Sequence, residues 1–329
     1  MRAIVCTEYG PPEQLRLREH PDPVCGAGQV LIQVHAAGVN FVDSLLVSGQ
    51  YQIRIPPPFV PGGDCAGTVI ALGEGVQNAA IGERILASSG IGAFAERLAL
   101  PVAQLHRMPA NMGFAGAAAF LQPNATAYFA LRERGALQAG ETLLVLGAAG
   151  GTGAAAVQIG KALGARVIAG ASSAEKLAAA AALGADATID YSRDDLRATL
   201  KEMTSGRGVD LVFDPVGGAL AESALRSCAE NARYLVIGFA SGEIPRIPLN
   251  LPLLKSCQIV GVDWGGFSMR HPRQARPLVD AALKLYADGL LQDPPLQCYP
   301  LEACGQAVAD LANRRITGRC VIEVSNDPG

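Results

Sequence analysis

Glycines recur between an apolar run and a helix-like run near the middle of the chain. Residues 143–146 are a short apolar stretch of the kind that a buried parallel strand requires. Residues 147–153 then read Gly-Ala-Ala-Gly-Gly-Thr-Gly. Glycines allow a tight turn close to a pyrophosphate, and the N–H groups that open a helix attract that anion. In the G-x-G-x-x-G register, Ala148 replaces the first glycine, while Gly150 and Gly153 occupy the other places. The pattern predicts a dinucleotide-binding turn that contacts the pyrophosphate through Ala149, Gly150, Gly151, Thr152 and Gly153.

A second strand, expected at 166–169, indicates which dinucleotide is bound. Sites for NAD usually carry an Asp or Glu about 20 residues after the first glycine, where it binds the ribose 2′-hydroxyl. Here no carboxylate appears until Glu175. Ser172, Ser173 and Lys176 instead offer donors and positive charge to a 2′-phosphate. Lys176 alone would be read as a solvated helix residue, but with the carboxylate missing we expect NADPH rather than NADH.

Composition excludes several classes of protein. The chain has 329 residues, 50% of them hydrophobic and 17% charged, which is typical of a globular protein of two domains. No apolar run reaches about 18 residues, so we expect no membrane span, and the N-terminus lacks the apolar core of a signal peptide. A cytoplasmic location is therefore expected. The net charge of −3 and the absence of a long basic run argue against nucleic acid as a partner. Eight scattered cysteines without a C-x-x-C pair are expected to be reduced, mostly in the core.

The hydrophobic pattern changes character along the chain. Before about residue 120 we expect short strands separated by Gly and Pro clusters, at 30–35, 67–71 and 84–87. From 121 to 261 strands alternate with helices, the strands falling at 142–146, 166–169, 187–190, 209–214, 233–237 and 258–262. Later segments predict a helix at 277–287 and a closing strand at 320–324. The alternation predicts an α/β fold with a doubly wound parallel sheet at 121–261, and a β-rich domain at 1–120 that 262–329 completes.

Five segments, in this order and with short gaps, carry a family resemblance: Gly38-Val-Asn-Phe-Val-Asp43, Pro61-Gly-Gly-Asp-Cys-Ala-Gly67, Ala148-Ala-Gly-Gly-Thr-Gly153, Val209-Asp-Leu-Val-Phe-Asp-Pro-Val-Gly217 and Thr317-Gly-Arg-Cys-Val-Ile322. Together they resemble the medium-chain dehydrogenase/reductase superfamily, within it the zinc-free quinone oxidoreductase (zeta-crystallin-like) branch. The resemblance implies a GroES-like β-rich catalytic domain, a Rossmann domain and a cofactor cleft between them.

The chain departs from the zinc-containing members of that superfamily at each ligand position. Where those enzymes place a ligating Cys, this chain has Asn40, and where they place His it has Gly63 followed by Asp64. The third position falls near Gln122, and the four-cysteine structural lobe is missing. None of these positions supplies the Cys or His ligands of zinc enzymes, so we expect no metal site. For Asp64 a hydrogen-bonded structural role is favoured over that of a general base.

Without a metal, the reaction is restricted to certain acceptors. Oxidation of an alcohol needs stabilisation of an alkoxide, which a bound metal provides by lowering the pKa of the oxygen. Quinones and α,β-unsaturated carbonyls instead delocalise the charge that arrives with a hydride. Such an acceptor needs only positioning, exclusion of water and hydrogen bonds to its oxygen.

The resemblance also assigns individual site residues. It implies that Asn40 and Tyr51 line the acceptor slot, with Tyr51 a candidate proton donor to the developing oxyanion; a half-exposed loop aromatic is the equally weighted alternative. The remaining residues are implied to contact the cofactor: Thr126 and the loop containing Gly238, Phe239 and Ser241 near the nicotinamide, Tyr191 near the adenosine phosphate, and Arg319 near the pyrophosphate. Thr126 as a helix residue without ligand contact and Arg319 as a surface arginine remain the alternatives.

The sequence thus predicts an NADPH-dependent, zinc-independent reductase of quinones or other conjugated carbonyls. An enoyl-thioester or enone reductase is the nearest alternative: a basic patch at the cleft mouth would favour a CoA ester, and an apolar cleft would favour quinones. A non-catalytic NADPH-binding sensor is the alternative of another class. We also expect a homodimer, since the apolar strand at 258–264 would be an aggregation hazard if left bare.

Overall fold

The computed structural model describes residues 1–325, and its contacts divide the chain into two compact units. The first contains Met1–Gln122 together with the chain from Pro295 onward, and the second contains Pro123–Pro294. The first division lies close to the boundary at residue 120 expected from the sequence. Residues 262–294 differ from the expectation, because they belong to the second unit rather than to the β-rich one.

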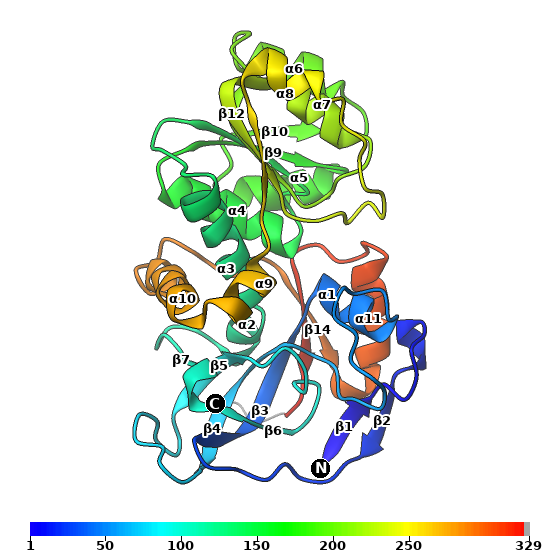
Figure 1. Ribbon diagram of the computed structural model, residues 1–329, viewed down its shortest axis with the longest axis vertical. Helices are drawn as coiled ribbons and strands as arrows, with labels where there is room; N and C mark the ends of the chain where they lie inside the picture. The colour runs from blue at the N-terminus through cyan, green and yellow to red at the C-terminus, as the bar shows by residue number, and fades with distance from the viewer. Residues whose placement is uncertain (326–329) are drawn as a thin grey trace. The chain divides into compact units, whose positions relative to one another are not determined.

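The first unit is built on a mostly antiparallel sheet (Figure 1). Its strands are β3 (Gln29–Val39), β4 (Asp64–Leu72), β5 (Arg84–Ser88), β6 (Arg97–Pro101), β7 (Leu105–Arg107), β14 (Leu296–Pro300) and β15 (Arg319–Glu323). Their order is β14-β15-β3-β4-β5-β7, with β6 paired to β3, and only β14 and β15 run parallel to each other. Strand β15 pairs with β3, so the segment at 319–323 adds a strand to this sheet. Strands β1 (Arg2–Val5) and β2 (Arg16–Glu19) form a separate ribbon.

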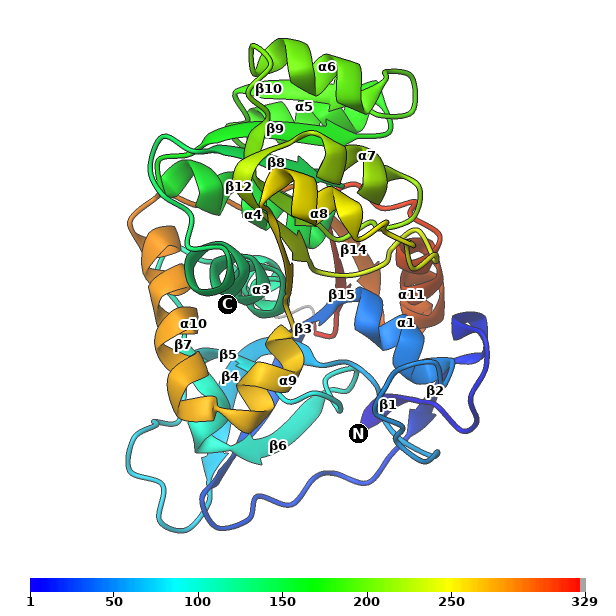
Figure 2. The same cartoon turned by 45° about the horizontal axis from the view of Figure 1, so that its top comes forward.

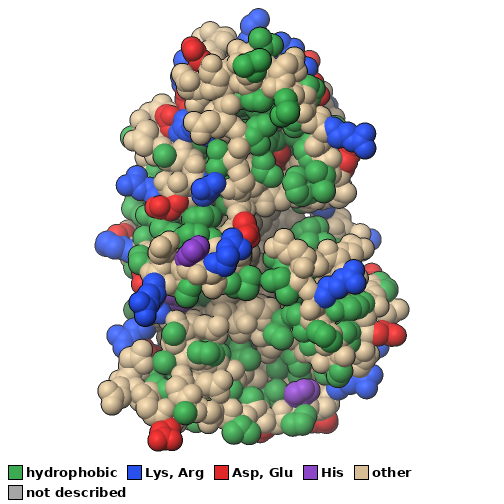
Figure 3. Space-filling model, in the orientation of Figure 1, with side chains coloured by type: hydrophobic (Ala, Val, Ile, Leu, Met, Phe, Trp, Pro, Cys, Tyr) green, Lys and Arg blue, Asp and Glu red, His purple; other side chains and the backbone are tan. Residues whose placement is uncertain are grey.

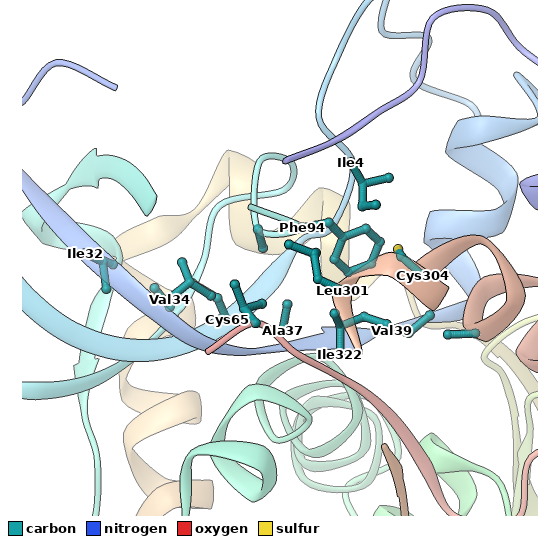
Figure 4. Packing of buried hydrophobic residues seen from close by; sticks show 14 of the residues in the cluster. Ile4, Ile32, Val34, Ala37, Val39, Cys65, Phe94, Leu301, Cys304 and Ile322 are labelled. Carbon is teal, nitrogen blue, oxygen red and sulfur yellow. The ribbon is translucent and has the colours of Figure 1, made fainter. Parts of the chain in front are cut away.

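Short helices surround this sheet. They are η1 (Pro12–Gln14), α1 (Phe41–Val47), η2 (Val102–Gln104), α2 (Phe114–Ala118), η4 (Leu301–Ala303) and α11 (Cys304–Ala312), while α3 (Leu121–Tyr128) spans the division between the units. Alternate residues of β3, namely Val30, Ile32 and Val34, are fully buried, as the period of a strand demands. Figure 4 shows Ile32 and Val34 in a core with side chains from β1, β4, α11 and β15, and Val30 belongs to the same cluster. Of the eight free cysteines six are buried, as expected of small core residues.

The second unit is a six-stranded parallel sheet. Its strands are β8 (Thr142–Leu146), β9 (Arg166–Ala171), β10 (Ala187–Asp190), β11 (Val209–Asp214), β12 (Cys228–Val236) and β13 (Gln258–Gly261). Their order, β10-β9-β8-β11-β12-β13, is that of a Rossmann sheet (Figures 1 and 2). The predicted strands at 142–146, 187–190 and 209–214 match β8, β10 and β11 at both ends.

Helices cover both faces of this sheet. Around it lie α4 (Gly151–Ala162), α5 (Ala174–Ala182), α6 (Leu196–Met203), α7 (Leu220–Arg226) and α8 (Asn250–Lys255). An added Cβ at Gly160 of α4 would lie 2.7 Å from Leu143, so this side of β8 faces α4. The next residue, Leu144, faces the opposite side, in one buried cluster with Leu196 of α6 and Ala221 of α7. The predicted doubly wound α/β fold is therefore confirmed.

Aromatic contacts explain why the segment after β13 belongs to this unit. The helices of that segment are α9 (Trp264–Arg270) and α10 (Pro272–Ala287). Phe267 stacks on Phe129, from the π-helix η3 (Phe129–Arg134), at 4.5 Å between ring centroids. The side chain of Gln158 in α4 also exchanges two hydrogen bonds with the backbone of Gln292, at 2.7 and 3.1 Å. Within residues 1–325, no helix is long and apolar enough to cross a bilayer.

Candidate functional site

The glycine-rich turn lies between β8 and α4, as predicted. Helix α4 begins at Gly151, and its N-cap, Gly150, has no side chain to bond the first N–H groups. An added Cβ at Gly153 would lie 2.2 Å from the carbonyl oxygen of Gly147, a distance that no real side chain tolerates. At Gly150 the same distance would be an ordinary 3.4 Å. The close approach of α4 to the backbone of Gly147 therefore requires a glycine at position 153. The start of the helix offers N–H groups to an anion such as a pyrophosphate.

The end of β9 carries the residues expected to distinguish NADPH from NADH. Ser172 is exposed, and Ser173 is the N-cap of α5, where its hydroxyl accepts from the backbone N–H of Lys176 at 3.4 Å. A hydroxyl that accepts one bond can still donate one, so this cap does not prevent Ser173 from contacting a phosphate. Tyr191 lies beside the end of β9, since a Cβ at Gly170 would be 3.2 Å from its ring. The nearest carboxylate along the chain, Glu175, lies in the first turn of α5.

Two further loops follow the carboxyl ends of β11 and β12. The loop at 238–243 contains Gly238, Phe239 and Ser241, and it packs against the loop at 215–218. The backbone N–H of Ser241 donates to the oxygen of Val216 at 2.8 Å. Because β8 and β11 flank the point where the strand order reverses, loops at these carboxyl ends surround the usual ligand crevice of such sheets. The structure therefore brings the predicted turn and the predicted loop to the same edge of the sheet.

In the first unit, Asp64 connects the three positions that zinc enzymes use for ligands. Its Oδ2 accepts from the side-chain Nδ2 of Asn40 and from the backbone N–H of Gln122, each at 3.1 Å. Asp64 is 2% exposed and opens β4. Asp64 is therefore buried and hydrogen-bonded, which agrees with the structural role that the sequence favoured. Asn40 is also the N-cap of α1, where its backbone N–H donates to Oδ2 of Asp43 at 2.7 Å.

Burial dominates the electrostatics of these two acids. It raises the pKa of Asp43 to about 7, and the neighbouring charge of Asp64 adds to this increase, while N–H groups of Asn40, Gly63 and Gly62 oppose it. Burial also raises the pKa of Asp64, against hydrogen bonds from Ser88, Gln122 and Asn40. Sequence reasoning missed Asp43, although it stands three residues after Asn40 in the spacing of a capping box.

The donors in this cluster do not match a zinc site. Amide and backbone N–H groups point at Asp64, whereas a tetrahedral zinc site is built from thiolate, imidazole or carboxylate ligands. In the part of the chain that the structure describes, no group of three or more His, Cys, Asp or Glu side chains could hold a metal ion.

The other predicted site residues lie in different places. Tyr51 is half-buried in the segment after α1, where its backbone N–H donates to Leu45 at 3.1 Å. Arg319 is only 4% exposed at the start of β15, so it is not the surface arginine that was the alternative. Thr126, in the second unit, is buried within α3 at 8% exposure.

Comparison with known proteins agrees with this architecture. Residues 26–110 match the family model of the alcohol dehydrogenase GroES-like domain, and residues 151–282 match that of the zinc-binding dehydrogenases. A quinone oxidoreductase-like protein 2 homolog from Nematostella vectensis is 38% identical over 98% of this chain and 88% of its own length. The chain belongs to the quinone oxidoreductase family of medium-chain dehydrogenases/reductases.

Solved structures give the same family. A quinone oxidoreductase from Pseudomonas syringae matches with a TM-score of 0.90 and 31% identity, over 98% of this chain and 99% of that one. The Escherichia coli quinone oxidoreductase complexed with NADPH matches with a TM-score of 0.89 and 28% identity, over 98% and 100% of the chains. This quinone oxidoreductase homologue is an oxidoreductase, and the expected GroES-like and Rossmann fold is confirmed.

Proposed function

We propose that this oxidoreductase uses NADPH, works without zinc, and transfers hydride to quinones or other conjugated carbonyl acceptors. The observation that carries the proposal is the arrangement around Asp64. An amide, a glycine and a backbone N–H stand where zinc-containing relatives place thiolate and imidazole ligands. Without such ligands a reaction that needs an alkoxide is disfavoured, whereas a conjugated acceptor spreads the arriving charge itself.

The residues at the carboxyl edge of the parallel sheet support the choice of NADPH. The start of α4 would hold the pyrophosphate, and Ser172, Ser173 and Lys176 would hold the 2′-phosphate. A relative whose solved structure contains NADPH matches over 98% of this chain. When bound, NADPH supplies the hydride. We assign contacts to the rest of the cofactor to Thr126, Tyr191, Gly238, Phe239, Ser241 and Arg319.

The acceptor would meet polar groups from the first unit. Asn40 has a second amide N–H beyond the one given to Asp64, and this hydrogen can be donated to an acceptor oxygen. Tyr51 would donate its phenolic hydrogen to the developing oxyanion. The capping box with Asp43 and the bond to Asp64 hold Asn40 at both its backbone and its side chain, so its amide is preorganised.

A panel of reactions with the purified protein tests the proposal. We expect NADPH to reduce simple quinones or enones, NADP⁺ not to oxidise primary alcohols, and chelators to leave turnover unchanged. Robust alcohol oxidation, or one tightly held zinc per chain by elemental analysis, would contradict it. Faster reduction of enoyl thioesters than of quinones would favour the alkene-reductase alternative. NADPH binding without turnover of any conjugated acceptor would favour the non-catalytic sensor.

Substitution of Tyr51 refines the same test. Tyr51→Phe should lower kcat with little change in KM, because an oxyanion donor acts mainly in the transition state and is worth about 10²–10³ in rate. An unchanged kcat would remove Tyr51 from the reaction and leave the class of enzyme intact.

We further propose that two copies associate through β13. This strand is the last in the sheet order, and Ile259 on it is 43% exposed. Nearby in the sequence, Leu249, Leu253 and Leu254 are more than three-quarters exposed; Figure 3 shows hydrophobic side chains gathered on the α7 and α8 side of this unit. Pairing of two such edges would cover backbone groups that otherwise invite aggregation. The cytoplasmic location remains a prediction.

A further inference from the structure

The loop at 215–218 touches both other loops at the switch point of the parallel sheet. The backbone N–H of Ala240 donates to Pro215 at 3.0 Å, that of Ser241 to Val216 at 2.8 Å, and that of Gly218 to Glu243 at 3.1 Å. On its other side, a Cβ at Gly147 would lie 3.0 Å from a methyl group of Val216. The loop therefore stands between the glycine-rich turn after β8 and the loop at 238–243.

This middle loop has a demanding backbone. Gly217 and Gly218 have φ angles of +67° and +61°, a region that side chains disfavour. Both are also crowded, because a Cβ at Gly217 would lie 2.9 Å from the ring of Phe239, and one at Gly218 would lie 2.8 Å from the hydroxyl of Ser241. A side chain added at either glycine would therefore displace the loop or the residue that it meets.

Asp214, the last residue of β11, holds the loop at 215–218 through hydrogen bonds to its backbone. Its Oδ1 accepts from the backbone N–H groups of Val216 at 2.8 Å and Gly217 at 2.9 Å. Its Oδ2 accepts from the hydroxyl of Tyr234 on the neighbouring strand β12. Asp214 is 3% and Tyr234 4% exposed, so water does not compete for these bonds. Burial and the charge of Asp214 raise the pKa of Tyr234, which keeps its hydroxyl a donor.

We propose that Asp214 and Tyr234 are positioning residues of the nucleotide site. The pair holds residues 215–218 in place, and this loop in turn sets the spacing between the glycine-rich turn and the loop at 238–243. The inference rests on the proposed binding of NADPH at this edge of the sheet. Neither residue takes part in hydride transfer. The pair could not be predicted from the sequence, because the two residues become partners only when β11 and β12 lie side by side.

The first arm of the test measures nucleotide affinity. Tyr234→Phe should raise the dissociation constant of NADPH, measured by fluorescence titration, by about tenfold, the order expected for loss of one hydrogen bond to a charged group. The dissociation constant of NADH should rise by the same factor, since the 2′-phosphate contacts lie elsewhere. The matched control is Tyr299→Phe. The hydroxyl of Tyr299 donates to Asp310 at 2.9 Å in the first unit, and its loss should leave both affinities unchanged.

A second variant reaches the same loop by another route. Gly218→Ala keeps both Tyr234 and Asp214, but its Cβ would lie 2.8 Å from the hydroxyl of Ser241, at a φ angle that alanine disfavours. It should cause a similar loss of affinity, and it serves if Tyr234→Phe does not fold. Wild-type affinity in both variants would overturn the proposal.

The second arm needs no cofactor. Amide hydrogen exchange of Tyr234→Phe should be faster at 147–153, 215–218 and 238–243, and unchanged in β10. Unchanged exchange at 147–153 and 238–243 would show that the pair supports only its own strand and would overturn the proposal. If the wild-type protein bound neither nucleotide, the proposed function would fail, while this arm would still decide whether the pair fixes the loops.

Discussion

At the scale of single residues, we predict that the preference for NADPH over NADH depends on the cation of Lys176. Lys176→Ala should reduce the preference for NADPH over NADH by about tenfold or more, because one charge-assisted bond to phosphate contributes about 1.5–3 kcal/mol. Titration of both nucleotides measures this preference, and NADH affinity should hardly change. Lys201→Ala, an exposed lysine of α6, is the control and should leave the preference intact. Equal affinities for the two nucleotides in the unaltered protein would refute the assignment.

Asp43 gives a second prediction, about stability and pH. Because its pKa is raised from 3.8 to about 7, the folded protein keeps a proton that the unfolded chain loses. The free energy of unfolding should therefore fall as the pH rises through this interval and level off above it. The side chain of Asp43→Asn cannot titrate. As the pH rises between these values, the free energy of unfolding of the variant should therefore increase relative to that of the wild type, by at most about 4 kcal/mol.

Thermal unfolding of both proteins from pH 4 to pH 8 measures that difference. Asp310→Asn provides a control of opposite sign, since the amide of Gln306 helps to lower the pKa of Asp310 and its contribution is lost as the pH falls. A stability difference between wild type and Asp43→Asn that does not change with pH would contradict the prediction.

At the scale of elements, the start of α4 can pack against the turn after β8 only because residue 153 is a glycine. Gly153→Ala should lower the free energy of unfolding by about 1–3 kcal/mol, because its Cβ would meet the backbone oxygen of Gly147 and the helix must move. Gly150→Ala is the matched control, with an ordinary contact to the same oxygen and an expected loss below about 1 kcal/mol, that of a poorer N-cap. Chemical denaturation measures both, and equal losses would show that α4 accommodates the added methyl group.

How far an element could be predicted depended on its burial. Every residue of β8 and β11 is buried, and both strands were predicted to their ends. Residues 143–146 of β8 are a continuous apolar run, while β11 has its run at 211–213 between two aspartates. Strand β14 was missed, since most of its residues are exposed and it shows no period. Helix α10 was predicted from residue 277, but it was assigned to the β-rich domain, whereas it belongs to the second unit. The aromatic stacking that helps hold the segment after β13 in the second unit joins residues far apart in sequence, such as Phe129 and Phe267.

Whether a part of the site could be predicted depended on whether its residues are neighbours in the sequence. The glycine-rich turn was visible because all its parts are contiguous in the sequence. The bond from Asn40 to Asp64 and that from Tyr234 to Asp214 join residues 24 and 20 positions apart, and burial is what makes the partners matter. A single sequence shows neither the partner nor the burial of Asp214, so Asp214 received no role from it. For Asp43 the spacing of a capping box with Asn40 was visible, but its burial was not.

At the scale of the whole molecule, the remaining question is how the edge of the parallel sheet is covered. We expect a homodimer with twice the 34.0 kDa mass of the chain at micromolar concentration, joined through β13. Ile259→Lys should shift the sedimentation coefficient to that of the monomer, because each copy would place a charge within an apolar contact. Ile70→Lys, an isoleucine of similar exposure on β4, is the control and should remain dimeric. If Ile259→Lys stays a dimer, the copies meet through another surface; if the unaltered protein is a monomer, this edge is tolerated without a partner, as its shortness would allow.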